Sequence, residues 1–282
     1  MPSLNQLSFI SEMISGERIQ DLCDVYCGHQ SDFDRNPRIS TQRQKHMALE
    51  RIREPWDNPP RIFCYSHCVK EFMAIVPLLQ NEFTLVSHNE DTNITEAYLP
   101  LLDSPKLLFW HAQNVMIRHP KLGGLPIGIA NAMWPHGNQE ILGEVCSKKA
   151  EKTNSVFFNF SIWTNEAERR ACYEQLKEKI PWQESQDFRP YLDTLATYKY
   201  AISPPGNGID CHRIWECIYL GVIPIVLRST FTERLNRVFP CILLDKWEDF
   251  NENSLLQMYL SPEYKISFDD LREHIEQGKS YF

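Results

Sequence analysis

The sequence predicts an α/β fold of two domains, each built on a parallel sheet. Three observations support this prediction: the chain length, the alternation of short apolar runs with segments of helical length, and a looser stretch with Gly, Pro and Lys near the middle. A chain of 282 residues is long enough for two domains with separate cores. Strands that alternate with helices favour parallel sheets with crossover helices.

The first half of the chain becomes regular after residue 60. Residues 1–60 contain an amphipathic stretch at 4–14, a candidate strand at 22–27 and a polar segment at 29–53. The predicted strands that follow are RIFCY (61–65), FTLVS (83–87), KLLFW (106–110) and LPIGI (125–129), with segments of helical length at 68–80 and 92–102. Residues 131–154 are the predicted linker.

A second series of strands and helices follows the linker. We predict strands at 155–160, 200–203, 222–227 and 241–244, and helices at 165–179, 190–198, 211–220, 231–236 and 267–279. The predicted domains are therefore 1–140 and 141–265, and the last helix, within 266–282, is expected to return to the first domain.

Composition limits the classes of function. A formal net charge of −8 argues against a nucleic-acid partner, because backbone binding needs a broad positive field. We see no secretory signal and no apolar run of transmembrane length, so a cytoplasmic enzyme is expected. Nine cysteines without a CxxC pair favour buried free thiols. Cys23–Cys27 and Cys64–Cys68, near His29 and His67, lack the usual zinc spacing, so no metal is predicted.

The segment SPPGNGIDCHRIWECIYLGVIPIV (203–226) carries most of the predicted chemistry. The strand ends at Ser203, Gly206 and Gly208 permit a tight loop, and Asp210 is a good N-cap for the next helix. If 211–220 is helical, four of its residues fall on one face, which we expect to face the core: Cys211, Ile214, Trp215 and Ile218.

Arg213 and Glu216 share the opposite side of this predicted helix, one turn apart. A cation in the first helical turn is unfavourable unless an anion is nearby, so the strand end, the glycine loop and Arg213 together indicate an anion site. The alternative is an Arg213–Glu216 ion pair on a solvated face, worth only about 0.2–0.5 kcal/mol. GNGID lacks the third glycine of a dinucleotide fingerprint.

The same segment resembles the nucleotide-sugar-binding segment of exostosin-type glycosyltransferases. The resemblance covers about 195–230 and rests on Arg213, Glu216, Gly221, Ile223, Pro224 and Ile225. It implies the GT-B fold, in which two Rossmann-like domains face a cleft. It also implies that Glu216 accepts hydrogen bonds from ribose hydroxyls and that Arg213 and the glycine loop face the diphosphate.

From the resemblance we expect an inverting, metal-independent hexosyl- or pentosyltransferase that uses a UDP-sugar and a glycan acceptor. UDP-xylose lies within the family's range of donors. The expected donor-binding residues of the segment are Ser203, Pro205, Gly206, Asn207, Gly208, Asp210, Arg213 and Glu216. Animal exostosins have a membrane anchor, so this chain fits a compact microbial or viral enzyme better, acting from the cytoplasm (of the host, if viral).

Polar residues after other predicted strands add to the site. Thr164, Asn165 and Arg169 follow 155–160 and are candidates for donor phosphate, although Asn165 with Glu168 also forms a good helix-capping pair. In the first domain His88 or Asp91 is the expected catalytic base, with a helix N-cap at Asp91 or Thr92 as the alternative.

Acceptor-side candidates complete the predicted site. They are Asp32, Asp34, His111 and Asn114. Asp32-Phe33-Asp34 also resembles an Asp-x-Asp metal motif, but it does not directly follow an apolar strand. Two other functions remain open at this point: a transferase or phosphorylase with another donor, such as a GDP-sugar or a dolichol-linked sugar, and a non-catalytic nucleotide-sugar sensor.

Overall fold

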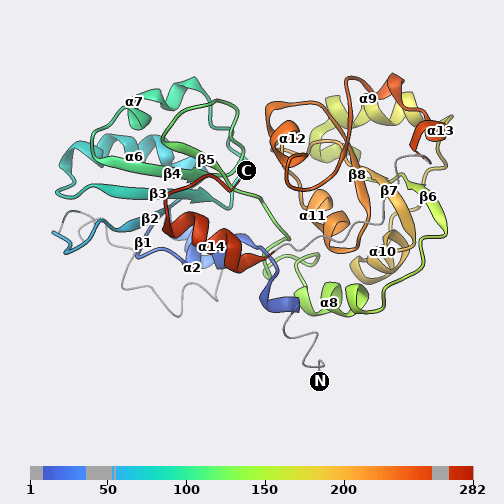
Figure 1. The fold of residues 1–282 in the computed structure, drawn as a ribbon, viewed down its shortest axis with the longest axis horizontal. Coiled ribbons are helices and arrows are strands. Elements are labelled where there is room, and N and C mark those ends of the chain that lie inside the picture. Colours follow the sequence, from blue (N-terminus) through green and yellow to red (C-terminus); the bar gives the residue numbers. More distant parts are fainter. Residues whose placement is uncertain (1–8, 36–52, 54, 256–266, 282) are drawn as a thin grey trace. The chain divides into compact units, whose positions relative to one another are not determined.

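A computed structural model describes residues 9–35, 53, 55–255 and 267–281. Contacts divide the chain into two compact units, which we call the first unit (14–127 with 267–282) and the second unit (1–13 with 128–266). The division by contacts therefore falls at residue 128, whereas the sequence places it at 140. Each unit contains one parallel sheet (Figure 1), which confirms the α/β class.

The first unit has a five-stranded sheet in the order β1-β2-β3-β4-β5. Its strands are β1 (Val25–Cys27), β2 (Arg61–Tyr65), β3 (Phe83–His88), β4 (Leu107–Ala112) and β5 (Leu122–Gly124). All neighbours pair in parallel. Because the strands are parallel, the residues that follow all five strands lie at one edge of the sheet.

Helices cover both faces of this sheet (Figure 1). The crossover helices α6 (Val69–Ile75) and α7 (Leu99–Leu102) lie on one face, and α2 (Gly16–Asp21) and α14 (Phe268–Glu276) lie on the other. Right-handed crossovers that advance in one direction place their helices on the same face. The remaining elements of this unit are α3 (Gln30–Asp34), η2 (Ser66–Cys68), η3 (Val76–Leu78) and η4 (Glu96–Tyr98).

Two predictions near the middle of the chain are wrong. The fifth strand is Leu122–Gly124 rather than 125–129, because Pro126 and Gly128, with φ +67°, interrupt the later apolar run. The predicted linker contains α8 (Gln139–Ser147). The side chain of Asn138 caps α8 by accepting hydrogen bonds from the amides of Glu140 and Ile141.

The second unit has a four-stranded parallel sheet in the order β6-β7-β8-β9. Its strands are β6 (Asn154–Phe157), β7 (Tyr198–Ile202), β8 (Ile223–Leu227) and β9 (Ile242–Leu244). Between and after them lie η5 (Ile162–Asn165), α9 (Glu166–Leu176), α10 (Phe188–Leu195), α11 (His212–Tyr219), α12 (Thr230–Leu235), η6 (Trp247–Asp249) and α13 (Glu252–Leu255).

Alternate strand residues of the second unit belong to different cores. Tyr200 and Ile202 pack in a cluster with Cys172 and Leu176 of α9. Ala201 between them packs in another, with residues of α10, α11 and α8. Both faces of the sheet are thus covered, which explains why its strands read as continuous apolar runs.

Neither sheet reverses its strand order among the described strands. The reversal point at which doubly wound sheets bind ligands is therefore not formed by these strands. The GT-B arrangement stays a prediction.

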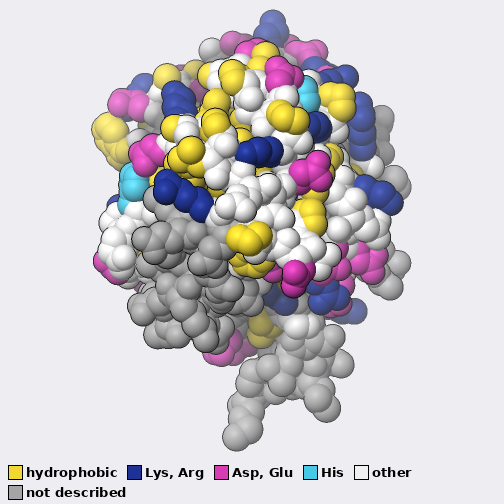
Figure 2. Space-filling model, turned by 90° about the vertical axis from the view of Figure 1, so that its left-hand side faces the viewer, with side chains coloured by type: hydrophobic (Ala, Val, Ile, Leu, Met, Phe, Trp, Pro, Cys, Tyr) yellow, Lys and Arg dark blue, Asp and Glu magenta, His cyan; other side chains and the backbone are white. Residues whose placement is uncertain are grey.

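The surface and the cysteines agree with the composition. The face drawn in Figure 2 carries acidic and basic side chains interspersed. All nine cysteines are free and all but Cys146 are buried, which confirms the expected free thiols. Within the described residues, no helix has both the length and the apolar character that crossing a bilayer requires.

Candidate functional site

The loop between β7 and α11 begins at Ser203, which continues the pairing of β7 with β8. The Ser203 amide donates to Ile225 O at 2.9 Å, and its hydroxyl donates to Ala201 O at 3.3 Å. The predicted core face of α11 is buried, with Trp215 fully enclosed. The prediction that Asp210 caps this helix is wrong, because Cys211 is the N-cap. The Asp210 carboxylate instead accepts from Trp215 Nε1 at 2.9 and 3.1 Å.

Residues that follow β6 hold this loop. Asn165 Nδ2 donates to Gly206 O at 2.8 Å, and Arg169 Nε donates to Pro205 O at 2.9 Å. A Cβ atom on Gly206 would lie 3.4 Å from Arg169 Nη2 and 3.8 Å from Thr164 Cγ2. Asn165 is the N-cap of α9, but its side chain bonds the loop and not the helix, so the predicted capping pair with Glu168 does not form. The three predicted residues thus meet the glycine loop.

Arg213 and Glu216 form an ion pair that is largely buried. Arg213 Nε lies 3.8 Å from Glu216 Oε2, and the two side chains are 17% and 8% exposed. The Arg213 guanidinium stacks over Tyr191, 4.8 Å from the ring centroid, and its Nη1 donates to Asn159 O at 2.7 Å. Tyr191 OH donates to Glu216 Oε2 at 2.5 Å. The alternative of a pair on a solvated face is therefore wrong.

The two arginines differ in their counter-charges. Arg169 is buried, and its guanidinium donates to the carbonyls of Pro205 and Ser161, but no carboxylate of a described residue lies within ion-pair distance. Burial lowers the pKa of Arg169, and the charge of Arg213 lowers it further. Burial also lowers the pKa of Arg213, but Tyr191 and Glu216 more than offset this. A positive charge without a partner carboxylate thus lies beside the glycine loop, where an anion would be stabilised.

The remaining residues of the loop between β7 and α11 differ in their exposure to solvent. Gly206 and Gly208 are buried, while Asn207 is exposed at the tip. Gly206 therefore keeps the backbone close to Arg169, and Asn207 is open to solvent. Sequence reasoning missed Tyr191 and Asn159, which fix the Glu216 carboxylate and the Arg213 guanidinium. Neither residue lies in a recognisable motif, since both contacts are made across the fold.

The predicted base residues of the first unit have different surroundings. His88 is buried, and an oxygen faces each ring nitrogen: Pro126 O lies 2.9 Å from Nε2, and Asn89 Oδ1 lies 3.1 Å from Nδ1. Asn89 itself has φ +66°, a left-handed conformation that asparagine tolerates. Asp91 is exposed. Of the two residues, Asp91 is therefore the one open to an acceptor.

The acceptor-side candidates do not form one group. His111 and Asn114 are buried at or after the end of β4, and Asn114 has φ +56°. Asp34 is exposed and accepts from Gln30 Nε2 at 2.8 Å. Asp32 is buried, and its Oδ2 accepts from the His29 amide at 2.8 Å and lies 3.3 Å from His67 Nε2.

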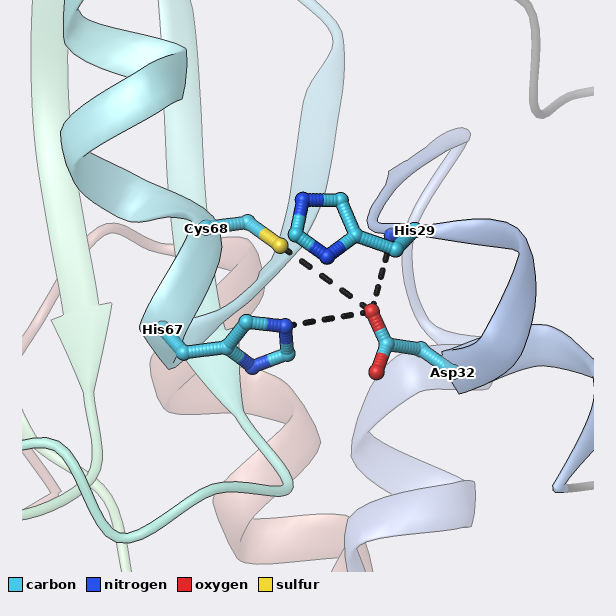
Figure 3. A group of neighbouring side chains, drawn as sticks. All are labelled: His29, Asp32, His67 and Cys68. Atoms are coloured by element: carbon cyan, nitrogen blue, oxygen red, sulfur yellow. Dashed lines mark hydrogen bonds and ion pairs between the residues drawn. The ribbon is translucent and has the colours of Figure 1, made fainter.

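Asp32 belongs to a cluster that sequence spacing did not reveal (Figure 3). The other members are His29, His67 and Cys68, and Cys68 Sγ lies 4.0 Å from Asp32 Oδ2. Burial and, next, the charge of Asp32 together raise the pKa of the Cys68 thiol to about 11. Two pairs of neighbours in the chain, after β1 and after β2, thus meet at the carboxyl edge of the sheet.

His111 is expected to make the first unit sensitive to acid. Both ring nitrogens are buried without a well-formed hydrogen bond, and burial lowers its pKa to about 3. The unfolded chain binds this proton below a pH of about 6.5, so stability is full above that pH and is lost as the pH falls towards 3. The loss is of the order of 3–5 kcal/mol over that window.

The measurement for His111 is urea unfolding at several pH values between 7 and 4. His111→Leu should show a flatter dependence on pH than the wild type. His136→Leu, a change at an exposed histidine, is the control and should keep the wild-type slope. Equal slopes in His111→Leu and the wild type would show that His111 does not titrate with unfolding.

Comparison with known proteins does not assign the chain to a family. The chain matches no protein-family model and no curated protein. The resemblance to exostosin-type enzymes therefore rests on the residues of the 195–230 segment.

Proposed function

We propose that the chain is a glycosyltransferase whose second unit binds a nucleotide-activated sugar at the glycine loop and the start of α11. The observation that carries the proposal is that Arg169 bonds this loop and Arg213 lies in the first turn of the helix that follows it, while Glu216 is the single carboxylate in ion-pair range of either arginine among the described residues. Such a surplus of buried positive charge favours a diphosphate. The motif resemblance supports the same ligand.

Each residue has a distinct part in this proposal. Arg213, Arg169 and the loop amides hold the diphosphate, and no metal is needed for its charge. Glu216 Oε2 is occupied by Tyr191, but its other carboxylate oxygen accepts no hydrogen bond from a described residue and is assigned to ribose hydroxyls. The donor is a UDP-sugar, of which UDP-xylose is the first to test.

The proposed reaction inverts the anomeric carbon. A base takes the proton of an acceptor hydroxyl while its oxygen bonds to the anomeric carbon, and the bond from that carbon to the diphosphate oxygen breaks. Asp91 is assigned as the base, because it is exposed, whereas His88 is buried and each of its ring nitrogens already faces a protein oxygen. That same feature of His88 favours a second candidate, a sensor that binds nucleotide sugars without transfer.

Calorimetric titration with UDP, GDP and uridine, with EDTA present, tests the proposal. UDP should bind more tightly than uridine, and EDTA should not change its affinity, because arginines meet the phosphate charge. A chain that binds none of these ligands would contradict the proposal.

Slow release of UDP from UDP-sugars separates the enzyme from the sensor. Asp91→Asn should lower turnover by about 10²-fold while UDP affinity stays unchanged. Binding without any release, in the presence of glycan acceptors, would favour the sensor.

A further inference from the structure

We propose that His29, Asp32, His67 and Cys68 of the first unit bind one Zn²⁺ ion. Their candidate ligand atoms all lie within 4.8 Å of one another (Figure 3). Two imidazoles, a carboxylate and a thiol form a mixed donor set that suits zinc, whereas Mg²⁺ and Ca²⁺ prefer oxygen ligands. This proposal does not depend on the proposed glycosyl transfer.

The spacing of the ligand atoms fits tetrahedral coordination. Metal–ligand distances of about 2.0–2.3 Å place neighbouring ligand atoms roughly 3.3–3.8 Å apart. Asp32 Oδ2 lies 3.3 Å from His67 Nε2 and 4.0 Å from Cys68 Sγ. Small side-chain rotations are therefore enough to close the four groups around one ion.

Both histidines have an outer carboxylate, as metal-binding histidines usually do. His29 Nε2 lies 3.1 Å from Glu71 Oε2, and its Nδ1 faces the cluster in Figure 3. His67 Nε2 points to Asp32, while its Nδ1 lies 3.7 Å from Glu90 Oε1. Each ring thus presents one nitrogen to the centre and the other to a glutamate.

The backbone holds the four ligands in place before any ion binds. His29 is the N-cap of α3, and Asp32 reaches back to its amide at 2.8 Å. His67 and Cys68 end η2, directly after β2. Because β1 and β2 are paired neighbours in the sheet, with Cys27 opposite Cys64, the two pairs of ligands meet at one edge.

The charge around the cluster favours a cation. Asp32, Glu71 and Glu90 lie against its two histidines, and Arg35, 3.9 Å from Glu90, is the one lysine or arginine paired with these carboxylates among the described residues. If Asp32 only accepted hydrogen bonds from its neighbours, its contacts with the His29 amide and the Cys68 thiol would be explained without a metal. That alternative would not explain why each of the two imidazole rings, of His29 and His67, directs one nitrogen to the centre of the cluster and the other to a glutamate.

The test begins with the whole chain, reduced and stripped of metal with a chelator. Titration with Zn²⁺ against a chromophoric competitor should show one tightly bound equivalent. Co²⁺ in its place should give the d–d bands of a tetrahedral ion and a thiolate-to-cobalt charge-transfer band. Absence of stoichiometric zinc binding, or a cobalt spectrum without the thiolate band, would overturn the proposal.

Variants assign the ion to these residues. Asp32→Asn and Cys68→Ser should each lower zinc affinity by about 100-fold or more, and Glu71→Gln by roughly tenfold. Asp34→Asn changes an exposed carboxylate on the same helix and should bind zinc as the wild type does. Zinc should raise the thermal midpoint of the wild type and Asp34→Asn but not of Asp32→Asn.

The outcome stays decisive if one variant does not fold. Circular dichroism without metal checks each variant, and His67→Gln, at a side chain about one-third exposed, replaces any that is unfolded. Zinc binding that survives in all folded variants would place the ion elsewhere and overturn the assignment. UDP titration of the stripped chain reports on the second unit separately, so failure of one proposal is distinguishable from failure of the other.

Discussion

Replacing Arg213 by glutamine is expected to weaken UDP binding by about 10- to 100-fold, while uridine affinity changes by less than about threefold. The physical reason is the loss of charge-assisted hydrogen bonds to phosphate, which are worth about 1.5–3 kcal/mol. The guanidinium is fixed by Tyr191 and by Asn159 O, so the site is ordered before the ligand arrives. Calorimetric titration of both ligands measures the difference.

Arg170→Gln is the matched control for this experiment. Arg170 lies on α9 next to Arg169, but it is exposed and pairs with Glu166 at 2.7 Å. Its replacement should leave both affinities unchanged. Equal weakening of uridine and UDP by Arg213→Gln would mean that Arg213 supports the pocket and does not contact phosphate.

Most of the strands, though not β5, were predictable from the sequence because they are largely buried and read as continuous apolar runs. Continuous apolar runs such as RIFCY (61–65) give a signal that does not depend on distant residues, and β2 begins and ends where the run does. The core face of α11 was predictable for a similar reason, since its helical period is local. Helix α8 was missed because Gly and Pro precede it and its apolar face is short.

The site was less predictable, because its decisive contacts join segments far apart in the sequence. Asn165 has the composition of a helix cap, yet its side chain bonds Gly206, 41 positions away. Asp210 likewise turns to Trp215. The ligands of the proposed zinc site come in two pairs, and only the pairing of β1 with β2 brings them together. Spacing rules for zinc motifs therefore did not find them.

The candidate sites of the two units are built in the same way but carry different charges. In each unit, parallel strands deliver polar residues to the carboxyl edge of the sheet. In the second unit these residues are Arg169 and Arg213 with one carboxylate, which favours an anion. In the first unit they are carboxylates, imidazoles and a thiol, which favour a cation. The sign of the uncompensated charge at each edge is the physical basis of the two different ligands that we propose.

Glu216→Gln is expected to lower the free energy of unfolding by about 3 kcal/mol in the absence of ligand. Removing one partner of a buried ion pair leaves the other charge uncompensated, which usually costs about 3–5 kcal/mol. Here the loss falls on Arg213, which already raises the electrostatic cost of burying Arg169. Glu233→Gln is the control, because its pair with Arg228 is exposed and worth at most about 1 kcal/mol.

Ligand binding by the same variant separates the two parts of the proposed pocket. Glu216→Gln should weaken uridine by roughly tenfold, since a charge-assisted hydrogen bond to ribose is lost. Inorganic pyrophosphate should bind at least as well as to the wild type, because the positive charge of the two arginines is then less compensated. Urea unfolding with and without pyrophosphate, and calorimetry with uridine, measure both effects. A variant as stable as Glu233→Gln, with unchanged uridine affinity, would remove Glu216 from the site.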